Sequence, residues 1–127
     1  MRTPTFSIEV ITLPVSDVER ALRFYVHQAG FTLDVDYAPN GAFRVVQLTP
    51  PGSNCSIALT SGAHQMAPGS IEGLQMVVDN AEVSRKELAD RGVEVSDIEV
   101  FPWGNFVYFK DPDGNGWALQ AIPHRDA

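Results

Sequence analysis

Hydrophobic and polar positions follow the same order twice along the chain. Residues 13–30 (LPVSDVERALRFYVHQAG) and residues 75–92 (QMVVDNAEVSRKELADRG) each run from an apolar stretch through an aspartate to a glycine. Asp17 corresponds to Asp79 and Gly30 to Gly92, so both pairs are separated by 62 residues. Self-similarity at a fixed offset is typical of a duplicated supersecondary unit. The pattern therefore predicts two copies of one module, each covering about half of the chain.

Each copy contains one predicted helix. Ser16 and Glu19 have the spacing of a capping box, in which each side chain bonds the backbone N–H of the other residue. Asp79 and Glu82 stand in the same relation at the start of the second helix. A glycine follows each helix and can supply a left-handed stop. The apolar positions of the first helix recur at helical spacing and predict one buried stripe: Val18, Leu22, Tyr25 and Ala29.

Short apolar runs between turn residues follow each helix, and such runs are typical of strands. The predicted strands are residues 31–37, 42–49 and 55–60 in the first copy, and 93–100, 105–110 and 116–122 in the second. With the apolar run before each helix, each copy has the order β-α-β-β-β. We predict one α+β domain over residues 1–127, with module one at 6–60, a linker at 61–70 and module two at 71–122.

The composition of the chain restricts the classes of function that are possible. The 127 residues include nine Lys and Arg against sixteen Asp and Glu, which gives a net charge of -7. An acidic surface argues against nucleic acid, whose binding proteins neutralise phosphate with basic side chains. No apolar run is long enough to span a membrane, and no signal peptide is evident. One cysteine, Cys55, permits no intrachain disulfide, so a reducing, cytoplasmic setting is expected.

The first repeat together with the segment YFKDPDGNGWALQ, residues 108–120, resembles the vicinal oxygen chelate superfamily. This superfamily includes glyoxalase I, extradiol dioxygenases and bleomycin-resistance proteins. The resemblance covers roughly residues 6–122. It implies two tandem βαβββ modules that form a curled mixed sheet with a cleft, completed in a homodimer in most members. It says less about the chemistry, because one fold hosts many functions.

Enzymes of this superfamily bind a divalent metal through His, Glu or Gln side chains on four strands. Carried over position by position, these four ligand positions fall on residues without donor atoms: Val10, Ala58, Gly73 and Ala118. Divalent ions need oxygen or nitrogen ligands. Glu9 and Glu72 are each one residue from a ligand position, and alternation points such neighbours to the opposite face of the strand. The resemblance therefore implies a member without the usual metal site, and no cofactor is expected.

Histidine does not replace the missing ligands. The chain has three histidines, at His27, His64 and His124, and no two of them have the spacing of metal ligands. We expect all three to be surface residues.

Strand alternation then predicts which side chains face the cleft. We expect small and apolar groups with a few amides and hydroxyls, which suits an apolar or aromatic small molecule. Trp117 and Phe109 are expected in the core instead. The cleft candidates are Val10, Thr12, Gln47, Ala58, Thr60, Gly73, Gln75, Trp103, Phe106, Tyr108, Ala118 and Gln120.

These observations leave three functions open. The first is a metal-free protein that binds a small organic ligand. The second is an enzyme, a lyase, isomerase or dioxygenase, with a displaced metal or with acid–base chemistry at Glu9, Glu72 or Tyr108. The third is a dimeric structural or regulatory module without a ligand. The sequence favours the first function, because the four ligand positions lack donors.

Overall fold

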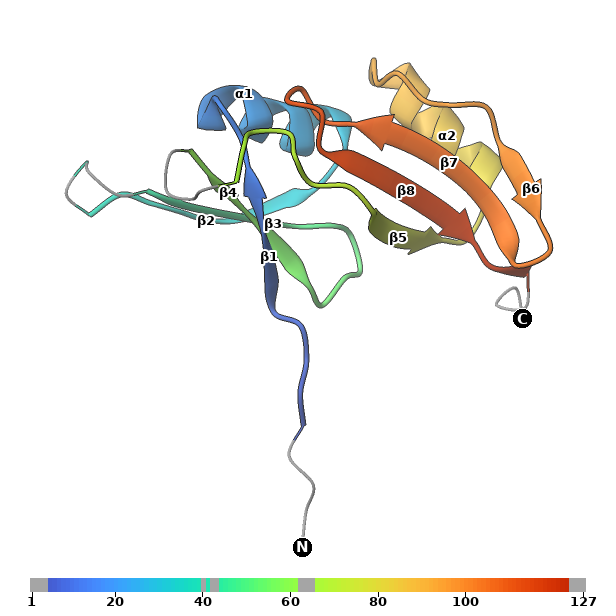
Figure 1. Ribbon diagram of the computed structural model, residues 1–127, viewed down its shortest axis with the longest axis horizontal. Coiled ribbons are helices and arrows are strands. Elements are labelled where there is room, and N and C mark those ends of the chain that lie inside the picture. Colours follow the sequence, from blue (N-terminus) through green and yellow to red (C-terminus); the bar gives the residue numbers. More distant parts are fainter. Residues whose placement is uncertain (1–4, 40, 42–43, 62–65, 124–127) are drawn as a thin grey trace, which may run out of the picture.

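Two successive βαβββ modules make up the chain, which confirms the predicted α+β class and tandem layout (Figure 1). The computed structural model describes residues 5–39, 41, 44–61 and 66–123. Module one consists of β1 (Val10–Pro14), α1 (Val18–Arg23), the π-helix η1 (Phe24–Gln28), β2 (Thr32–Tyr37), β3 (Val45–Thr49) and β4 (Ser56–Thr60). Module two consists of β5 (Leu74–Val78), α2 (Ala81–Asp90), β6 (Glu99–Phe101), β7 (Gly104–Lys110) and β8 (Gly116–Ala121).

Each module folds into a four-stranded sheet with the same strand arrangement. The orders are β1-β4-β3-β2 and β5-β8-β7-β6. The first and last strands of each module run parallel, and the other neighbours are antiparallel. A parallel pair needs a long connection, which the helix and two intervening strands provide. Figure 1 shows the two sheets next to each other, with α1 near the place where they meet. No helix in the described residues is long and apolar enough to cross a membrane.

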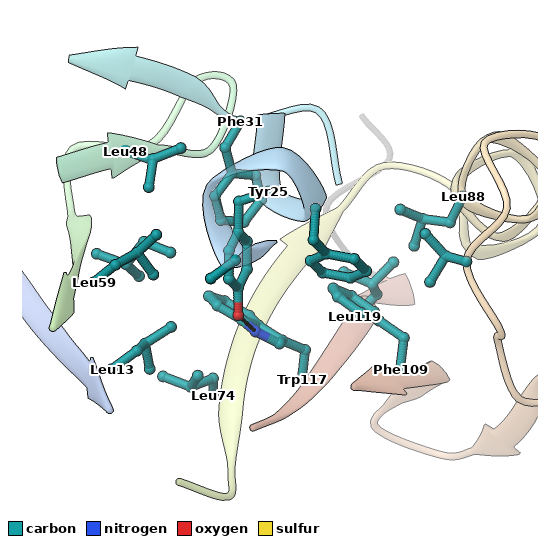
Figure 2. Close-up of a cluster of buried hydrophobic side chains, with 14 of the residues drawn as sticks. Leu13, Tyr25, Phe31, Leu48, Leu59, Leu74, Leu88, Phe109, Trp117 and Leu119 are labelled. Carbon is teal, nitrogen blue, oxygen red and sulfur yellow. Dashed lines mark hydrogen bonds between the residues drawn. The ribbon is translucent and has the colours of Figure 1, made fainter. Parts of the chain in front are cut away.

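One core is shared by both modules, because each sheet turns one apolar face toward the helices and toward the other module (Figure 2). Three aromatic rings contact one another where the modules meet: Tyr25 of η1, Phe31 of the first module and Trp117 of the second. The centroid of the Trp117 ring is 6.0 Å from that of Tyr25 and 5.6 Å from that of Phe31. Aromatic pairs at this separation contribute about 0.5–1.5 kcal/mol beyond the area they bury. The modules are therefore joined by packing as well as by the chain.

A buried polar network lies beside these rings. The Tyr25 hydroxyl donates to Asp111 Oδ2 at 2.8 Å and accepts from Trp117 Nε1 at 2.9 Å. Asn115 Nδ2 donates to Asp111 Oδ2 at 2.8 Å and to the carbonyl oxygen of Pro14 at 3.1 Å. Asp111 and Asn115 are the two buried polar residues of the described chain, at 4% and 0% exposure. Buried polar groups are costly unless paired, so this network fixes the junction in one geometry.

The end of the linker is held against the turn between β7 and β8, which contains Asp111 and Asn115. Gly69 has a φ of +76°, and its N–H donates to the carbonyl oxygen of Pro14 at 3.1 Å. A Cβ atom at Gly69 would lie 1.9 Å from the backbone oxygen of Asp113. Only glycine fits here, because any side chain would collide with backbone. Residues 62–65 of the linker lie outside the described part of the chain.

The predicted capping boxes are wrong at both helices. Asp17, not Ser16, is the N-cap of α1 and accepts from the N–H of Arg20 at 3.1 Å. The Ser16 hydroxyl instead donates to Asp113 Oδ1 at 2.6 Å, across the module junction. The N-cap of α2 is Asn80, one residue after the expected Asp79. The spacing located each helix start to within one residue, and at α1 the expected cap Ser16 makes a tertiary hydrogen bond instead.

The strand predicted over residues 93–100 is also wrong for most of its length, because β6 spans only Glu99–Phe101. Side chains bond the backbone in the preceding segment. Arg85 Nε donates to the carbonyl oxygen of Ser96 at 2.7 Å, and the Ser96 hydroxyl accepts from the N–H of Tyr108 at 2.9 Å. These bonds replace the regular ladder there. Residues 42–43 of another predicted strand lie outside the described residues, and β3 begins at Val45.

Candidate functional site

Each sheet has an outer face, by which we mean the side that points away from the shared core. In the second sheet, Tyr108 pairs with Ala118, Phe106 pairs with Gln120, and Gln75 pairs with Ala118. Paired residues point to the same side of a sheet, so these five candidates share the outer face. Their neighbours along β7 and β8, Phe109 and Trp117 among them, pack into the core as expected.

Four aromatic rings form a continuous row on this outer face. Trp103 stacks on Phe101 with ring centroids 5.1 Å apart and planes at 6°. Phe101 meets Phe106 edge to face at 5.8 Å, and Phe106 lies nearly parallel to Tyr108 at 6.2 Å. Trp103 is 61% exposed and Tyr108 38% exposed, whereas Phe106 is buried. We call these four residues the aromatic row. Its two exposed ends offer ring faces to a planar molecule.

Sequence reasoning missed one member of the row. Phe101 pairs with Gly104 at the end of β6, and its ring stacks on that of Trp103. The signal in the sequence was the run of residues from Phe101 to Phe106. A turn at residues 102–103 reverses the chain there, so aromatic residues on either side of the turn can lie on the same face of the sheet. The predicted strand ends at residue 100, so Phe101 lies just outside it.

Hydrogen bonds hold the loop that carries Trp103 onto the sheet. Gln120 Nε2 donates to the carbonyl oxygen of Trp103 at 3.0 Å. Gln75 Nε2 in turn donates to Gln120 Oε1. The two glutamines thus bridge β5, β8 and the β6–β7 turn. Because the backbone of Trp103 is held on the sheet, this residue loses little conformational freedom when a ligand binds, which favours affinity.

Tyr108 sits beside a carboxylate. Loss of hydration raises the pKa of the Tyr108 hydroxyl above its ordinary value, and the charge of Glu99 raises it further. The hydroxyl is therefore protonated at neutral pH and serves as a hydrogen-bond donor. A base at this position is disfavoured by the same shift.

The first sheet carries the other candidates on its own outer face. Thr12 pairs with Ala58, and Ala58 pairs with Gln47, so these three lie side by side. Val10 and Thr60 lie on the same side at the ends of β1 and β4. Two residues that sequence reasoning missed continue this face on β2 and are exposed: Val35 and Tyr37. The result is a mostly apolar surface with the Gln47 amide and the hydroxyl groups of Thr12, Thr60 and Tyr37.

A groove of about 1050 Å³ brings some of the candidates together. Gly73, Tyr108 and Ala118 line it, but no residue of the first sheet does. Glu72, which alternation placed on the opposite face, also borders this groove. Glu72 precedes β5, and Gly73, with a φ of +84°, interrupts the extended backbone there, so strand alternation does not apply to Glu72.

A second cavity, of about 530 Å³, lies between the modules near α2. Of the candidates, only Gln75 lines it. The candidates of the first sheet therefore line neither of these two spaces. Within one chain, the predicted residues form two separate groups, one on each outer face.

The four carried-over metal positions do not fit a divalent ion. Val10, Ala58, Gly73 and Ala118 offer no donor atoms, and a Cβ at Gly73 would meet open space. Across residues 5–39, 41, 44–61 and 66–123, no three His, Cys, Asp or Glu side chains gather in a way that could hold a metal. His27 is exposed on η1, while His64 and His124 lie outside the described residues.

Comparison with known proteins places these features in context. Residues 7–119 match the Glyoxalase/Bleomycin resistance protein/Dioxygenase superfamily. Among solved structures, TnmS3, an antibiotic binding protein from Streptomyces sp. CB03234, is 35% identical with a TM-score of 0.84. The match covers 94% of this chain and 98% of TnmS3.

Two further relatives have similar extents. A glyoxalase/bleomycin resistance protein from the same Streptomyces strain is 38% identical with a TM-score of 0.79, over 90% of this chain and 99% of that one. The uncharacterized protein YetH of Bacillus subtilis (strain 168) is 24% identical over 119 residues, which are 89% of this chain and 96% of YetH.

Proposed function

Because this chain belongs to the Glyoxalase/Bleomycin resistance protein/Dioxygenase superfamily, we propose that it is a metal-free protein that binds an apolar or aromatic organic molecule. The observation that carries the proposal is the aromatic row, with Trp103 and Tyr108 exposed on the outer face of the second sheet. Large exposed apolar groups held by a rigid sheet are typical of a binding surface. The four ligand positions without donors argue for binding without a metal.

Similarity to TnmS3 supports the same function. TnmS3 is an antibiotic binding protein and shares 35% of its residues with this chain. The specific form of the proposal is therefore that this chain sequesters or carries an aromatic antibiotic or a related metabolite.

We further propose that the binding cleft forms in a homodimer. Both outer faces expose apolar side chains within one chain, including Val10 and Tyr37 on the first sheet and Val77 and Trp103 on the second. If the first sheet of one copy faced the second sheet of the other, the two groups of candidates would line one cleft. Light scattering after size-exclusion chromatography tests this arrangement. A stable monomer that binds ligand at full affinity would contradict it.

The binding experiment uses a panel of aromatic antibiotics and metabolites in a thermal-shift screen. We expect at least one compound to raise Tm and to quench tryptophan fluorescence, since Trp103 is exposed. Trp103→Ala should weaken that compound at least about tenfold, in line with the loss of a stacking anchor. Val100→Ala is the matched control, because Val100 is also exposed on β6 but pairs with Asn105, off the aromatic row.

Two results would contradict the proposal. One is a panel that leaves Tm unchanged throughout. The other is a stoichiometric metal in protein purified without added metal or chelator, measured by elemental analysis and bound with micromolar or tighter affinity.

The enzymatic alternative draws less support. A general base needs a pKa near the working pH. The pKa of Tyr108 is raised, which suits a donor and not a base. Glu72 borders the groove with Gly73, but the described residues place no histidine or cysteine beside it there. Conversion of a bound compound, followed by mass spectrometry, would revive this alternative.

A further inference from the structure

One carboxylate stands directly beside the aromatic row. Glu99 of β6 pairs with Phe106 of β7, so its side chain lies on the outer face next to that ring. Phe106 is nearly parallel to Tyr108, and the Glu99 charge reaches the Tyr108 hydroxyl, where it raises the pKa. Glu99 therefore borders the same surface on which a planar ligand would stack.

This carboxylate has no basic partner among the described residues, unlike several other acidic side chains. Arg44 binds both Glu19 and Asp36, and Lys86 binds Asp90. The ion pairs of the described chain do not include Glu99, whose side chain is exposed. Its charge is thus available to a bound molecule.

The surroundings reinforce a negative potential. Glu72 and Glu94 border the groove that Tyr108 lines, and the whole chain has a net charge of -7. One cation, Lys110, lies two residues beyond Tyr108 on the same face of β7, away from the end at which β6 pairs. A ligand on the row therefore meets a carboxylate at the Phe106 side and a lysine past Tyr108. This asymmetry would orient a charged ligand.

We propose that the ligand of this site is a planar aromatic cation, and that Glu99 is the residue that selects its positive charge. The proposal rests on the function proposed above and specifies its ligand class. The rings supply stacking for any planar molecule. The carboxylate adds attraction for a ring system that carries a protonated amine or a cationic ring nitrogen, and it repels an anion of the same shape.

Three planar three-ring probes of equal size test the charge preference. They are a 9-aminoacridinium cation, uncharged anthracene bearing a hydroxymethyl group, and anthracene-9-carboxylate, each titrated by fluorescence at neutral pH and low salt. We expect the wild-type protein to bind the cation most tightly and the carboxylate most weakly. An exposed charge pair contributes at most about 1 kcal/mol, so Glu99→Gln should lower the affinity for the cation about fivefold. The same change should leave the uncharged probe within about twofold and strengthen the carboxylate.

Two further variants separate local recognition from general charge. Glu82→Gln makes the same change in net charge on α2, which packs against the opposite face of the second sheet, and should leave all three affinities unchanged. Glu99→Asp keeps the charge and should retain the preference for the cation. Added salt should lower the affinity for the cation more in the wild-type protein than in the Glu99→Gln variant.

The inference would be overturned if Glu99→Gln changed all three affinities alike, if Glu82→Gln matched its effect, or if the carboxylate bound best. It would also be overturned if no three-ring probe bound while a compound of another class raised Tm. In that case the proposed binding function would stand with a different ligand. The ligand class and the binding function would both be contradicted only if no compound bound, in this experiment or in the thermal-shift screen.

Discussion

Tyr25 joins the two modules through a single hydroxyl group. It is fully buried, its ring packs against both Phe31 and Trp117, and its hydroxyl both donates to Asp111 and accepts from Trp117. Burial, and then the charge of Asp111, raise the pKa of Tyr25 far above its ordinary value. The hydroxyl therefore remains protonated in the folded protein under all mild conditions.

We predict that Tyr25→Phe lowers the free energy of unfolding by about 1–3 kcal/mol, because Trp117 Nε1 loses its acceptor inside the core. Urea unfolding followed by circular dichroism measures the change. Tyr37→Phe is the control, since Tyr37 is 59% exposed and should change stability little. Equal stability of the two variants would show that the buried hydroxyl contributes nothing.

The same residue predicts a pH dependence. Unfolded tyrosine ionises near pH 10, whereas folded Tyr25 keeps its proton, so the unfolded state binds fewer protons above that pH. Stability contributed by Tyr25 is complete below about pH 10 and falls as the pH rises further. The Tyr25→Phe variant should lose less stability than the wild-type protein between neutral and strongly alkaline pH.

Single residues were predictable where alternation alone decides their environment. Trp117 and Phe109 are in the core at 5% and 4% exposure, because their strand positions point that way. Ser16 was not predictable, because its partner Asp113 is 97 residues away in the sequence. A local spacing rule cannot see such a partner.

The two helices show how closely an element start can be read from sequence. Asn80 caps α2 through its side-chain oxygen, which accepts from the N–H of Val83 at 2.9 Å. The side chain of Asp79 forms none of the hydrogen bonds found in the described chain, although it has the favoured spacing to Glu82.

We expect Asn80→Ala to lower the free energy of unfolding by about 0.5–2 kcal/mol, the usual cost of removing an N-cap. Asp79→Ala is the matched control and should cost distinctly less. Thermal denaturation of both variants distinguishes the positions. A larger loss for Asp79→Ala would restore the capping box expected from the sequence.

The segment before β6 marks the limit of strand prediction. Residues 93–98 carry the apolar spacing of a strand, but Arg85 and Ser96 side chains satisfy backbone groups that a neighbouring strand would otherwise bond. The short β6 leaves Phe101 and Glu99 at the sheet edge. Phe101 was missed for this reason, because it lies just beyond the predicted strand, whereas Glu99 lies within it and was missed because only apolar, amide and hydroxyl groups were expected.

At the scale of the whole molecule, the repeat predicted two modules and the resemblance implied their topology, and both agree with the structure. Parity also indicated which side of each strand faces outward. The sequence could not indicate which sheet faces which, because parity is a property of one strand and the pairing of two sheets depends on distant contacts. The candidates consequently fall into two groups, on separate outer faces.

The position of the linker end gives a prediction at this scale. Gly69 and Gly52 have nearly equal φ values, +76° and +77°, but only Gly69 faces backbone at close range. We predict that Gly52→Ala costs about 1–2 kcal/mol from the left-handed backbone alone. Gly69→Ala should cost about 1–3 kcal/mol more, because the methyl group collides with Asp113. Chemical denaturation of the pair isolates the contact, and equal losses would show that the linker end is free to move.

The contact at Gly69 also affects how a ligand binds. This contact and the core that the modules share hold the second module against the first, so the angle between the two modules is set when the chain folds. The rings and amides on the outer faces are then in their final places before any molecule arrives. Association should accordingly proceed without a closing movement, and its rate should follow diffusion and charge rather than a conformational step.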